Sequence, residues 1–172
     1  MNSVILVDEL DNMLGTMEKM AAHRLGKLHR AFSVFIFNSK GQLLLQQRAL
    51  NKYHSGGKWT NTCCSHPMPG EKTLDAAHRR LQQEMGLKCE LSYAFNFVYS
   101  ADMSNGISEH EYDHVYAGIS DDIPMPDPDE VAAYEYVNIN SLAKELKKTP
   151  ELYTEWLKIC FERVMEYYQT IF

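Results

Sequence analysis

The amino-acid sequence predicts an α+β or mixed-sheet α/β fold, formed as a single domain by residues 1–172. Strand-like segments fill much of the chain up to residue 64, one helical pattern follows, and more strand-like segments precede two closing helices. Runs of strands with few helices between them are typical of this class. The length of 172 residues fits one domain with its own core, and the sequence holds no internal repeat or low-complexity tract.

Four strands are expected in the N-terminal part of the chain, over residues 3–8, 30–37, 42–50 and 59–64. The first is followed by a turn-rich stretch at 8–15. The second and third flank Asn-Ser-Lys-Gly at 38–41, which predicts a hairpin because turn residues separate two apolar runs. Residues 51–58 contain two glycines and are expected to form a loop.

The middle of the chain predicts an amphipathic helix over residues 73–87. Its apolar side chains recur at helical spacing, at Leu74, Ala77, Leu81 and Met85. Thr73 is a suitable N-cap for this helix, and Gly86 is a suitable residue to end it.

The C-terminal part predicts three strands and two helices. The strands are expected at 93–102, 107–118 and 132–139, with a loop at Asn105 and Gly106 and a proline-rich connection at 123–130. The helices are expected at 141–148 and 150–172. The second helix has a stripe of apolar residues expected to face the core: Leu152, Trp156, Ile159, Cys160 and Val164.

The acidic balance of the chain argues against nucleic acid as a partner. Lys and Arg number 17 against 23 Asp and Glu, a formal net charge of −6. Nucleic-acid phosphates would be repelled over most of such a surface. A small phosphate-bearing substrate is still compatible with it, because a few well-placed cations are enough to bind one.

The cytoplasm is the expected location. No apolar stretch has the length needed to cross a bilayer, so no membrane partner is expected, and the N-terminus lacks the basic region of a signal peptide. The cysteines are therefore expected to be free thiols in a reducing compartment: Cys63, Cys64, Cys89 and Cys160. Their spacing is not that of a structural zinc site.

Three carboxylates alternate within the segment Ser-Glu-His-Glu-Tyr-Asp-His at 108–114. Alternate residues of a strand share a face, so Glu109, Glu111 and Asp113 should project together and repel one another unless a proton or a cation joins them. A solvated strand face would explain one such motif alone. The alternative is a mixed site for Mg²⁺, Mn²⁺ or Zn²⁺ that histidines near strand ends would complete: His23, His29 and His66.

The adjacent cysteines are separated by the same alternation. If residues 59–66 are extended, Cys64 and His66 share one face and Cys63 points to the other. Cys63 is then expected to be a buried apolar residue. Cys64 is the candidate reactive thiol, because positive charge nearby favours the thiolate.

Arg80 and Glu84 lie four residues apart and therefore share one face of the predicted helix. A stabilising surface ion pair would explain them. The alternative is that Arg80 contacts a substrate phosphate while Glu84 holds a metal ion bound to that phosphate.

Taken together, these segments resemble the type 1 isopentenyl-diphosphate isomerases, members of the Nudix superfamily. The resemblance covers most of the chain and rests on EKMAAHR, LHRAFSVFIFNSKGQLLLQQRA, KWTNTCCSHPMPGE, RRLQQEMG, GISEHEYDH and the tryptophan of PELYTEW. It implies an α+β fold of the Nudix type, a mixed-sheet α/β/α sandwich, and the conversion of isopentenyl diphosphate to dimethylallyl diphosphate.

The chain departs from the motif of Nudix hydrolases, G-x5-E-x7-R-E-U-x-E-E-x-G-U, where U is apolar. Glu71 and Glu84 match acids of that motif, but Ser65 replaces its first glycine, and Arg80 and Gln83 replace two of its acids. Loss of these acids should weaken the metal cluster that drives hydrolysis.

The resemblance also implies roles for individual residues. Cys64 and Glu111 match the catalytic pair. A His₃Glu₂ site for Mn²⁺, Mg²⁺ or Zn²⁺ would be formed by His23, His29, His66, Glu109 and Glu111. Glu84 matches the ligand of a Mg²⁺ ion that accompanies the diphosphate. The residues that match the substrate-binding set are Lys19, Arg48, Lys52 and Arg80 for the diphosphate, and Tyr99 and Trp156 for the hydrocarbon.

Two other functions remain open from the sequence. A Nudix diphosphate hydrolase would use the same fold, although the missing acids count against it. A non-catalytic metal-binding protein would use Cys64 and the histidines as zinc ligands, but it leaves Arg48, Lys52 and Arg80 without a common purpose.

Overall fold

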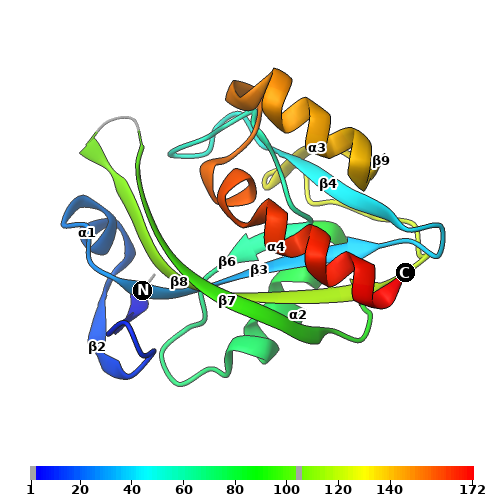
Figure 1. Cartoon of the computed structure of the whole chain (residues 1–172). Coiled ribbons are helices and arrows are strands. Elements are labelled where there is room, and N and C mark those ends of the chain that lie inside the picture. The colour runs from blue at the N-terminus through cyan, green and yellow to red at the C-terminus, as the bar shows by residue number, and fades with distance from the viewer. Residues whose placement is uncertain (1–2, 104–105) are drawn as a thin grey trace.

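The computed structural model of the chain describes residues 3–103 and 106–172. Asn105, expected in a loop, lies outside the described residues. The described strands form one mixed sheet with helices on both faces (Figure 1), which confirms the predicted α+β class. The strands are β1 (Ser3–Val7), β2 (Met13–Glu18), β3 (His29–Phe37), β4 (Gln42–Arg48), β5 (Trp59–Thr60), β6 (Cys63–Ser65), β7 (Ser92–Asp102), β8 (Ser108–Ile119) and β9 (Val131–Asn138). The helices are α1 (Lys19–Arg24), α2 (Thr73–Met85), α3 (Ile139–Lys148) and α4 (Glu155–Ile171), and a 3₁₀ turn at Pro150–Leu152 precedes α4.

Strand β3 is the centre of the sheet. It pairs in parallel with β8 and antiparallel with β1, β4 and β6. The antiparallel β7 extends the sheet beyond β8, and β4 carries β5 and β9. The β3–β8 register places His29 beside Glu111, and the β3–β6 register places Ser33 beside Cys64. These two registers bring distant parts of the chain to one place.

Alternation along β3 divides the core into two layers. Phe32, Val34 and Ile36 belong to a cluster with the buried face of α2, whereas Phe35 and Phe37 belong to a cluster with α3 and α4. A strand buried on both faces reads as a continuous apolar run, which explains the segment Ala-Phe-Ser-Val-Phe-Ile-Phe. Figure 1 shows α4 crossing one face of the sheet with α2 behind it.

Two N-terminal elements were not predicted. Residues 13–15, expected in a turn, belong to β2, which pairs with β1 as a hairpin. Helix α1 follows at once, and the Glu18 carboxylate caps it by accepting hydrogen bonds from Met20 N and Ala21 N, at 2.9 and 2.7 Å. A six-residue helix is too short to leave a periodic signal in the sequence.

The predicted cap of α2 is wrong. Thr73 is the first helical residue, and Lys72 is the N-cap residue without a side-chain cap bond. The other end is as expected: Gly86 ends the helix with φ +68°, a left-handed conformation that glycine adopts without a Cβ penalty. The hairpin turn at 38–41 is also confirmed, since β3 ends at Phe37 and β4 begins at Gln42.

Two further predictions need correction. The expected strand at 59–64 is two short strands, because β5 pairs with β4 whereas β6 pairs with β3. In the C-terminal stripe, Trp156, Cys160 and Val164 are buried, but Leu152 is 51% exposed and Ile159 is 47% exposed. Leu152 lies in the 3₁₀ turn, which changes its direction relative to the helix.

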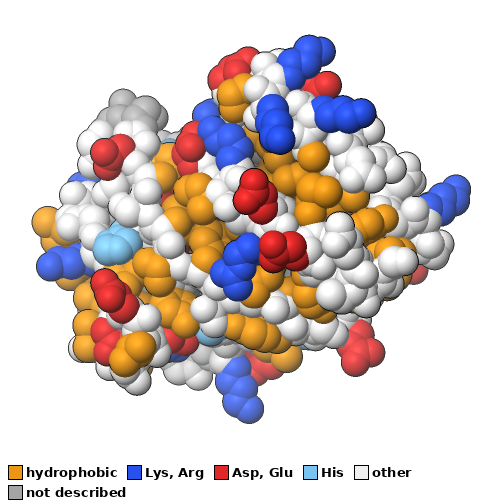
Figure 2. Space-filling model, in the orientation of Figure 1, with side chains coloured by type: hydrophobic (Ala, Val, Ile, Leu, Met, Phe, Trp, Pro, Cys, Tyr) orange, Lys and Arg blue, Asp and Glu red, His pale blue; other side chains and the backbone are white. Residues whose placement is uncertain are grey.

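The surface shows no single charge sign over the face that carries α4. Figure 2 shows acidic and basic side chains interspersed there, with several Lys and Arg side chains near α3. No helix among the described residues combines the length and apolar character that a bilayer crossing requires.

Candidate active site

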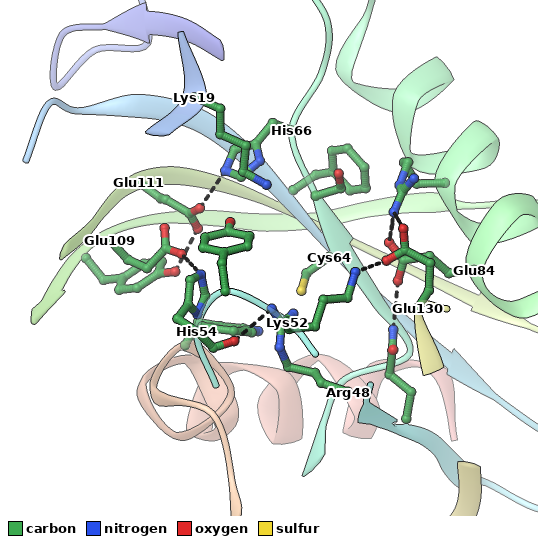
Figure 3. A pocket seen from close by; sticks show the side chains of 17 residues that line it. Lys19, Arg48, Lys52, His54, Cys64, His66, Glu84, Glu109, Glu111 and Glu130 are labelled. Carbon is green, nitrogen blue, oxygen red and sulfur yellow. Dashed lines mark hydrogen bonds and ion pairs between the residues drawn. The ribbon is translucent and has the colours of Figure 1, made fainter. Parts of the chain in front are cut away.

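A pocket opens beside β3, β6 and β8, between α2 and the first turn of α4. It contains every residue proposed from the sequence for catalysis or substrate binding (Figure 3), whereas His23 and His29 are not among its lining residues. The lining residues are Lys19, Phe32, Gln46, Arg48, Lys52, Tyr53, His54, Cys64, Ser65, His66, Arg80, Glu84, Tyr99, Glu109, Glu111, Glu130 and Trp156.

Five side chains gather at one end of the pocket. They are the set expected as metal ligands: His23, His29, His66, Glu109 and Glu111. One ligand atom from each lies within 4.8 Å of those from all the others. They come from α1, the start of β3, the residue after β6, and two alternate positions of β8. The fold therefore assembles the predicted set from separate stretches of the chain.

Backbone carbonyls orient two of these histidines. His23 Nδ1 lies 2.6 Å from Lys19 O, one helical turn earlier, and His29 Nδ1 lies 2.8 Å from Lys27 O. Each contact requires a proton on Nδ1, which leaves Nε2 free to bind a metal ion. His29 Nε2 faces Glu111 Oε1 at 3.7 Å. This use of the second ring nitrogen is common among metal-binding histidines.

The buried atoms of this cluster fit a bound cation. Among the described residues, His23 Nε2 and Glu109 Oε2 lack an aligned hydrogen bond, although both are buried and only 3.1 Å apart. Buried polar atoms normally have a partner. Two such atoms that face each other without a hydrogen bond are compatible with a shared ion, and three nitrogens with two carboxylates suit a divalent metal.

Glu111 lies where the metal cluster meets the rest of the pocket. Its Oε1 is 2.8 Å from His66 Nε2, and its Oε2 accepts a 2.7 Å hydrogen bond from the Tyr99 hydroxyl. Burial would raise the pKa of Glu111, but contacts from His29 and His66 outweigh it and hold the pKa well below its usual range. Burial also lowers the pKa of His66 to about 4, so this histidine is neutral near pH 7.

The third carboxylate of the motif, Asp113, has a different environment. It shares the strand face with Glu109 and Glu111, as alternation predicts, but it lies further along β8 and accepts a 2.7 Å hydrogen bond from Ser33 Oγ. Burial raises its pKa, and the negative charge of Glu111 raises it further. Asp113 is therefore protonated under conditions where Glu111 is ionised.

The two cysteines separate as the alternation predicts. Cys63 is fully buried in the core beside α2, while Cys64 lines the pocket together with His66. The expected reactivity of Cys64 stays a prediction. Burial raises the pKa of Cys64 although Arg48 opposes it, and a neutral His66 supplies no positive charge. Burial therefore favours the thiol form of Cys64.

Charged side chains gather at the other end of the pocket. Arg80 Nη2 donates to Glu84 Oε1 at 2.7 Å and lies 3.2 Å from Glu130 Oε1, while Lys52 forms a close ion pair with Glu130. Gln46 Nε2 donates to the second oxygen of Glu84 at 2.9 Å. Figure 3 shows Glu84 and Glu130 together at this end, and Cys64 between them and the Glu109–Glu111 end.

Two further cations contact aromatic rings. Lys19 Nζ lies 4.9 Å from the ring centre of Tyr53, and the Arg48 guanidinium lies 5.4 Å from the ring of Trp156. The Trp156 indole is fixed by a 3.1 Å hydrogen bond from Nε1 to Asn61 Oδ1. Its ring is thus held in the pocket wall with a cation nearby.

Comparison with known proteins identifies the family. A model of the NUDIX domain matches residues 27–157. A relative in Pectobacterium atrosepticum, "Isopentenyl-diphosphate Delta-isomerase", is 54% identical over 98% of this chain and 94% of its own length. The chain belongs to the type 1 isopentenyl-diphosphate isomerase family. "Isopentenyl-diphosphate Delta-isomerase 2" of Aromatoleum aromaticum is 52% identical over 95% of this chain and 87% of its own length.

Solved structures show the same fold at low sequence identity. DR0079 from Deinococcus radiodurans aligns with a TM-score of 0.79 and 20% identity, over 94% of this chain and 98% of that one. A MutT NUDIX hydrolase from Burkholderia pseudomallei gives a TM-score of 0.63 at 21% identity, over 80% and 98%. This isomerase-family chain therefore has the Nudix fold.

The acids retained from the hydrolase motif have separate environments in this member of the isomerase family. Glu84 lines the pocket, but Glu71 is not among the lining residues. Both oxygens of Glu71 instead accept hydrogen bonds from Arg79, at 2.7 and 2.8 Å, and Oε2 also accepts one from Met68 N. Glu71 thus fixes the loop before α2 to the helix.

Sequence reasoning missed two charged residues of the isomerase-family pocket. Glu130 was assigned to a proline-rich connection, and His54 to a glycine-bearing loop. Glu130 contacts both Lys52 and Arg80, and His54 contacts Glu109. No periodic pattern in the sequence links these positions to their partners. The only signal for a pocket role was the residue type: an acid just before a strand, and a histidine next to a tyrosine.

Proposed function

We propose that the protein interconverts isopentenyl diphosphate and dimethylallyl diphosphate by adding a proton at one carbon and removing one from another. Membership in the isomerase family supports the reaction. The observation that carries the mechanism is the pocket, where Cys64 and Glu111 line one cavity whose other end holds Lys52 and Arg80. The substrate is thus a small-molecule diphosphate.

The diphosphate is proposed to bind through Lys52 and Arg80 at the charged end of the pocket, with Lys19 and Arg48 as the other cations that line the cavity. Because Arg80 and Lys52 are already paired with carboxylates, they are held in position before substrate arrives. Glu84 is proposed to hold Mg²⁺ that accompanies the diphosphate, an assignment that suits a hard cation shared between carboxylate and phosphate oxygens. The diphosphate is an anchor and takes no part in the bond changes.

The second proposed metal site consists of His23, His29, His66, Glu109 and Glu111, with Mg²⁺, Mn²⁺ or Zn²⁺ as the ion. A bound cation there would supply a positive charge that stabilises the buried carboxylates and tunes the acidity of groups around them. The donor set does not distinguish these three ions, since imidazole and carboxylate bind all of them.

The proton transfers are assigned to Glu111 and Cys64. A proton delivered through Glu111 adds to the terminal CH₂ carbon of the alkene, and the positive charge forms on the tertiary carbon. The Cys64 thiol must first give up its own proton. The resulting thiolate, on the opposite face, then accepts a proton from the neighbouring CH₂ group, and the electrons of that C–H bond form the new double bond. The Tyr99 hydroxyl donates a hydrogen bond to Glu111 Oε2 at 2.7 Å and so orients the carboxyl, which must carry a proton before the step.

The carbocation needs a dry and electron-rich surrounding. Trp156 is 4% exposed, and its ring lies with a cation at 5.4 Å in the substrate-free pocket. The ring quadrupole is proposed to stabilise the positive charge of the intermediate in the same manner. Tyr99 is proposed to line the hydrocarbon side and to keep water from the reacting carbons.

Turnover in D₂O tests the reaction and its mechanism together. Isopentenyl diphosphate is incubated with the protein and the divalent ions, and the products are examined by NMR. The expected product is dimethylallyl diphosphate with deuterium in the new methyl group. An isomer without deuterium would refute the protonation route, and inorganic phosphate as the main product would replace this function with hydrolysis.

A Nudix diphosphate hydrolase is the second candidate, favoured by the fold alone. The contacts of Glu71 argue against hydrolysis. Both oxygens of this motif acid accept hydrogen bonds from Arg79, and its carboxylate does not line the pocket, so it is not placed to hold a metal ion there. A purely metal-binding protein would not need the paired cations at the opposite end of the cavity.

Two broader proposals follow from the same assignments. Residues 1–172 are proposed to act as one domain, since the pocket takes residues from α1 to α4. The cytoplasm is proposed as the location, which agrees with four cysteines that remain free thiols.

A further inference from the structure

His54 is a buried histidine that the proposed reaction does not use. It is 4% exposed, and its Nε2 lies 2.6 Å from Glu109 Oε1. The two atoms are in close polar contact, but His54 Nε2 is not aligned to donate a hydrogen bond to this oxygen. Figure 3 shows the ring beside Glu109 at the metal end of the pocket.

The loop that carries His54, residues 49–58, is folded tightly back on β4. Arg48 N donates to Lys58 O at 2.9 Å, and Gly57 N donates to Arg48 O at 3.0 Å. A Cβ atom at Gly56 would lie 2.6 Å from Leu50 O, so this position has no room for a side chain. The backbone thus holds His54 in place from both ends of the loop.

Aromatic neighbours fix the direction of the His54 ring. Tyr53 lies edge-on with ring centres 4.4 Å apart, and Trp156 lies edge-on at 6.0 Å. The Arg48 guanidinium also donates to His54 O at 3.3 Å. The ring is therefore directed at Glu109 by packing as well as by the loop backbone.

The two oxygens of Glu109 have different partners. Oε2 faces His23, a member of the metal cluster, at 3.1 Å, while Oε1 faces His54. His54 is not part of the five-residue cluster. It therefore contacts the far oxygen of a proposed metal ligand, where a close polar partner can control how the near oxygen is presented.

We propose that His54 is a positioning residue that fixes the Glu109 carboxylate with one oxygen directed at the metal site. This inference rests on the proposed metal site and adds a partner to it. It also links the 49–58 loop, whose Lys52 belongs to the diphosphate end, to the metal end of the pocket. Partners of this kind contribute roughly 10- to 100-fold to metal affinity.

The test measures metal affinity in the absence of substrate. Mn²⁺ and Zn²⁺ are titrated in competition with a chelator into the unaltered protein and into three variants, His54→Phe, His54→Gln and His54→Asn. Gln can place its amide nitrogen near the original Nε2, Asn is too short to reach it, and Phe keeps the ring without a donor. His78→Phe, a change on α2 outside the pocket, is the matched control.

The expected order of affinity is the unaltered protein and His54→Gln first, with His54→Asn and His54→Phe weaker by roughly 10- to 100-fold and His78→Phe unchanged. Equal affinity of all variants would overturn the proposal. If His54→Gln loses as much metal affinity as His54→Phe, His54 is itself a metal ligand and the positioning role is overturned. If His54→Phe does not fold, the Gln–Asn comparison decides. Failure of the unaltered protein to bind either ion would overturn the metal site itself.

Discussion

Replacing Cys63 and Cys64 by alanine, one at a time, separates a packing role from a chemical role. Cys63 is fully buried among core residues. Loss of its sulfur removes buried surface comparable to one methylene, about 0.8 kcal/mol, and leaves a small cavity that adds about 0.5 kcal/mol. We expect Cys63→Ala to lower the free energy of unfolding by about 1–1.5 kcal/mol and Tm by roughly 2–6 °C. Its turnover should be largely kept.

Cys64→Ala should behave in the opposite way. Its side chain lies on the pocket wall, so the free energy of unfolding should change by about 0.5 kcal/mol or less. Turnover should fall by roughly 10²–10⁴-fold, as expected for loss of an acid–base group. Urea unfolding and the rate of isomer formation are measured on both variants. Loss of activity in Cys63→Ala with normal activity in Cys64→Ala would refute the alternation argument and the role of Cys64 together.

Three further substitutions test the surroundings of the site. Glu130→Gln should raise KM for the diphosphate substrate roughly 2- to 10-fold with little change in kcat, because two cations lose the partner that holds them; a fall in KM would show that the carboxylate competes with substrate. Glu71→Gln should cost about 0.5–1 kcal/mol of unfolding free energy at pH 7. Hydrogen bonds from Arg79 lower the pKa of Glu71 from its ordinary 4.5, so this contribution is present above that pH and is lost as pH falls through the lowered value; urea unfolding at pH 7 and pH 3 should show the difference between the two proteins shrinking. Gly86→Ala should lower stability by about 1–2 kcal/mol or more in the same assay, because φ is +68° and the new Cβ would lie 2.7 Å from Met125 O; unchanged stability would mean that the backbone there adjusts freely.

Alternation explains most of what the sequence predicted correctly. The two-residue period places Cys63 in the core, Cys64 in the pocket, and Glu109 with Glu111 on one face of β8. These predictions need only the local conformation of a strand. The clustering of the five proposed metal ligands was expected from family resemblance, and the structure shows that it depends on the β3–β8 register. Their roles remain predictions.

The features that the sequence did not predict depend on contacts that form only in the folded chain. Helix α1 is stabilised by the Glu18 cap and by contacts with neighbouring strands, neither of which leaves a periodic pattern. His54 and Glu130 acquire their partners through loops, whose path depends on the finished fold. The pKa of the Cys64 thiol depends on the folded surroundings in the same way. Sequence proximity to a histidine says nothing of burial, which here raises the pKa of the thiol and lowers that of the histidine.

The parallel pairing of β3 with β8 has a consequence for folding kinetics. His29 and Glu111 are neighbours in this register, and a slip by one residue would set His110 or Tyr112 beside His29 and turn both glutamates to the other face. Two strands so far apart in the sequence pair late, after a large loss of chain entropy. An ion bound by this cluster would therefore slow unfolding and leave the refolding rate unchanged. Amide hydrogen exchange in β3 and β8 should slow when the ion is added, because the bound ion stabilises the pairing of these two strands against local opening.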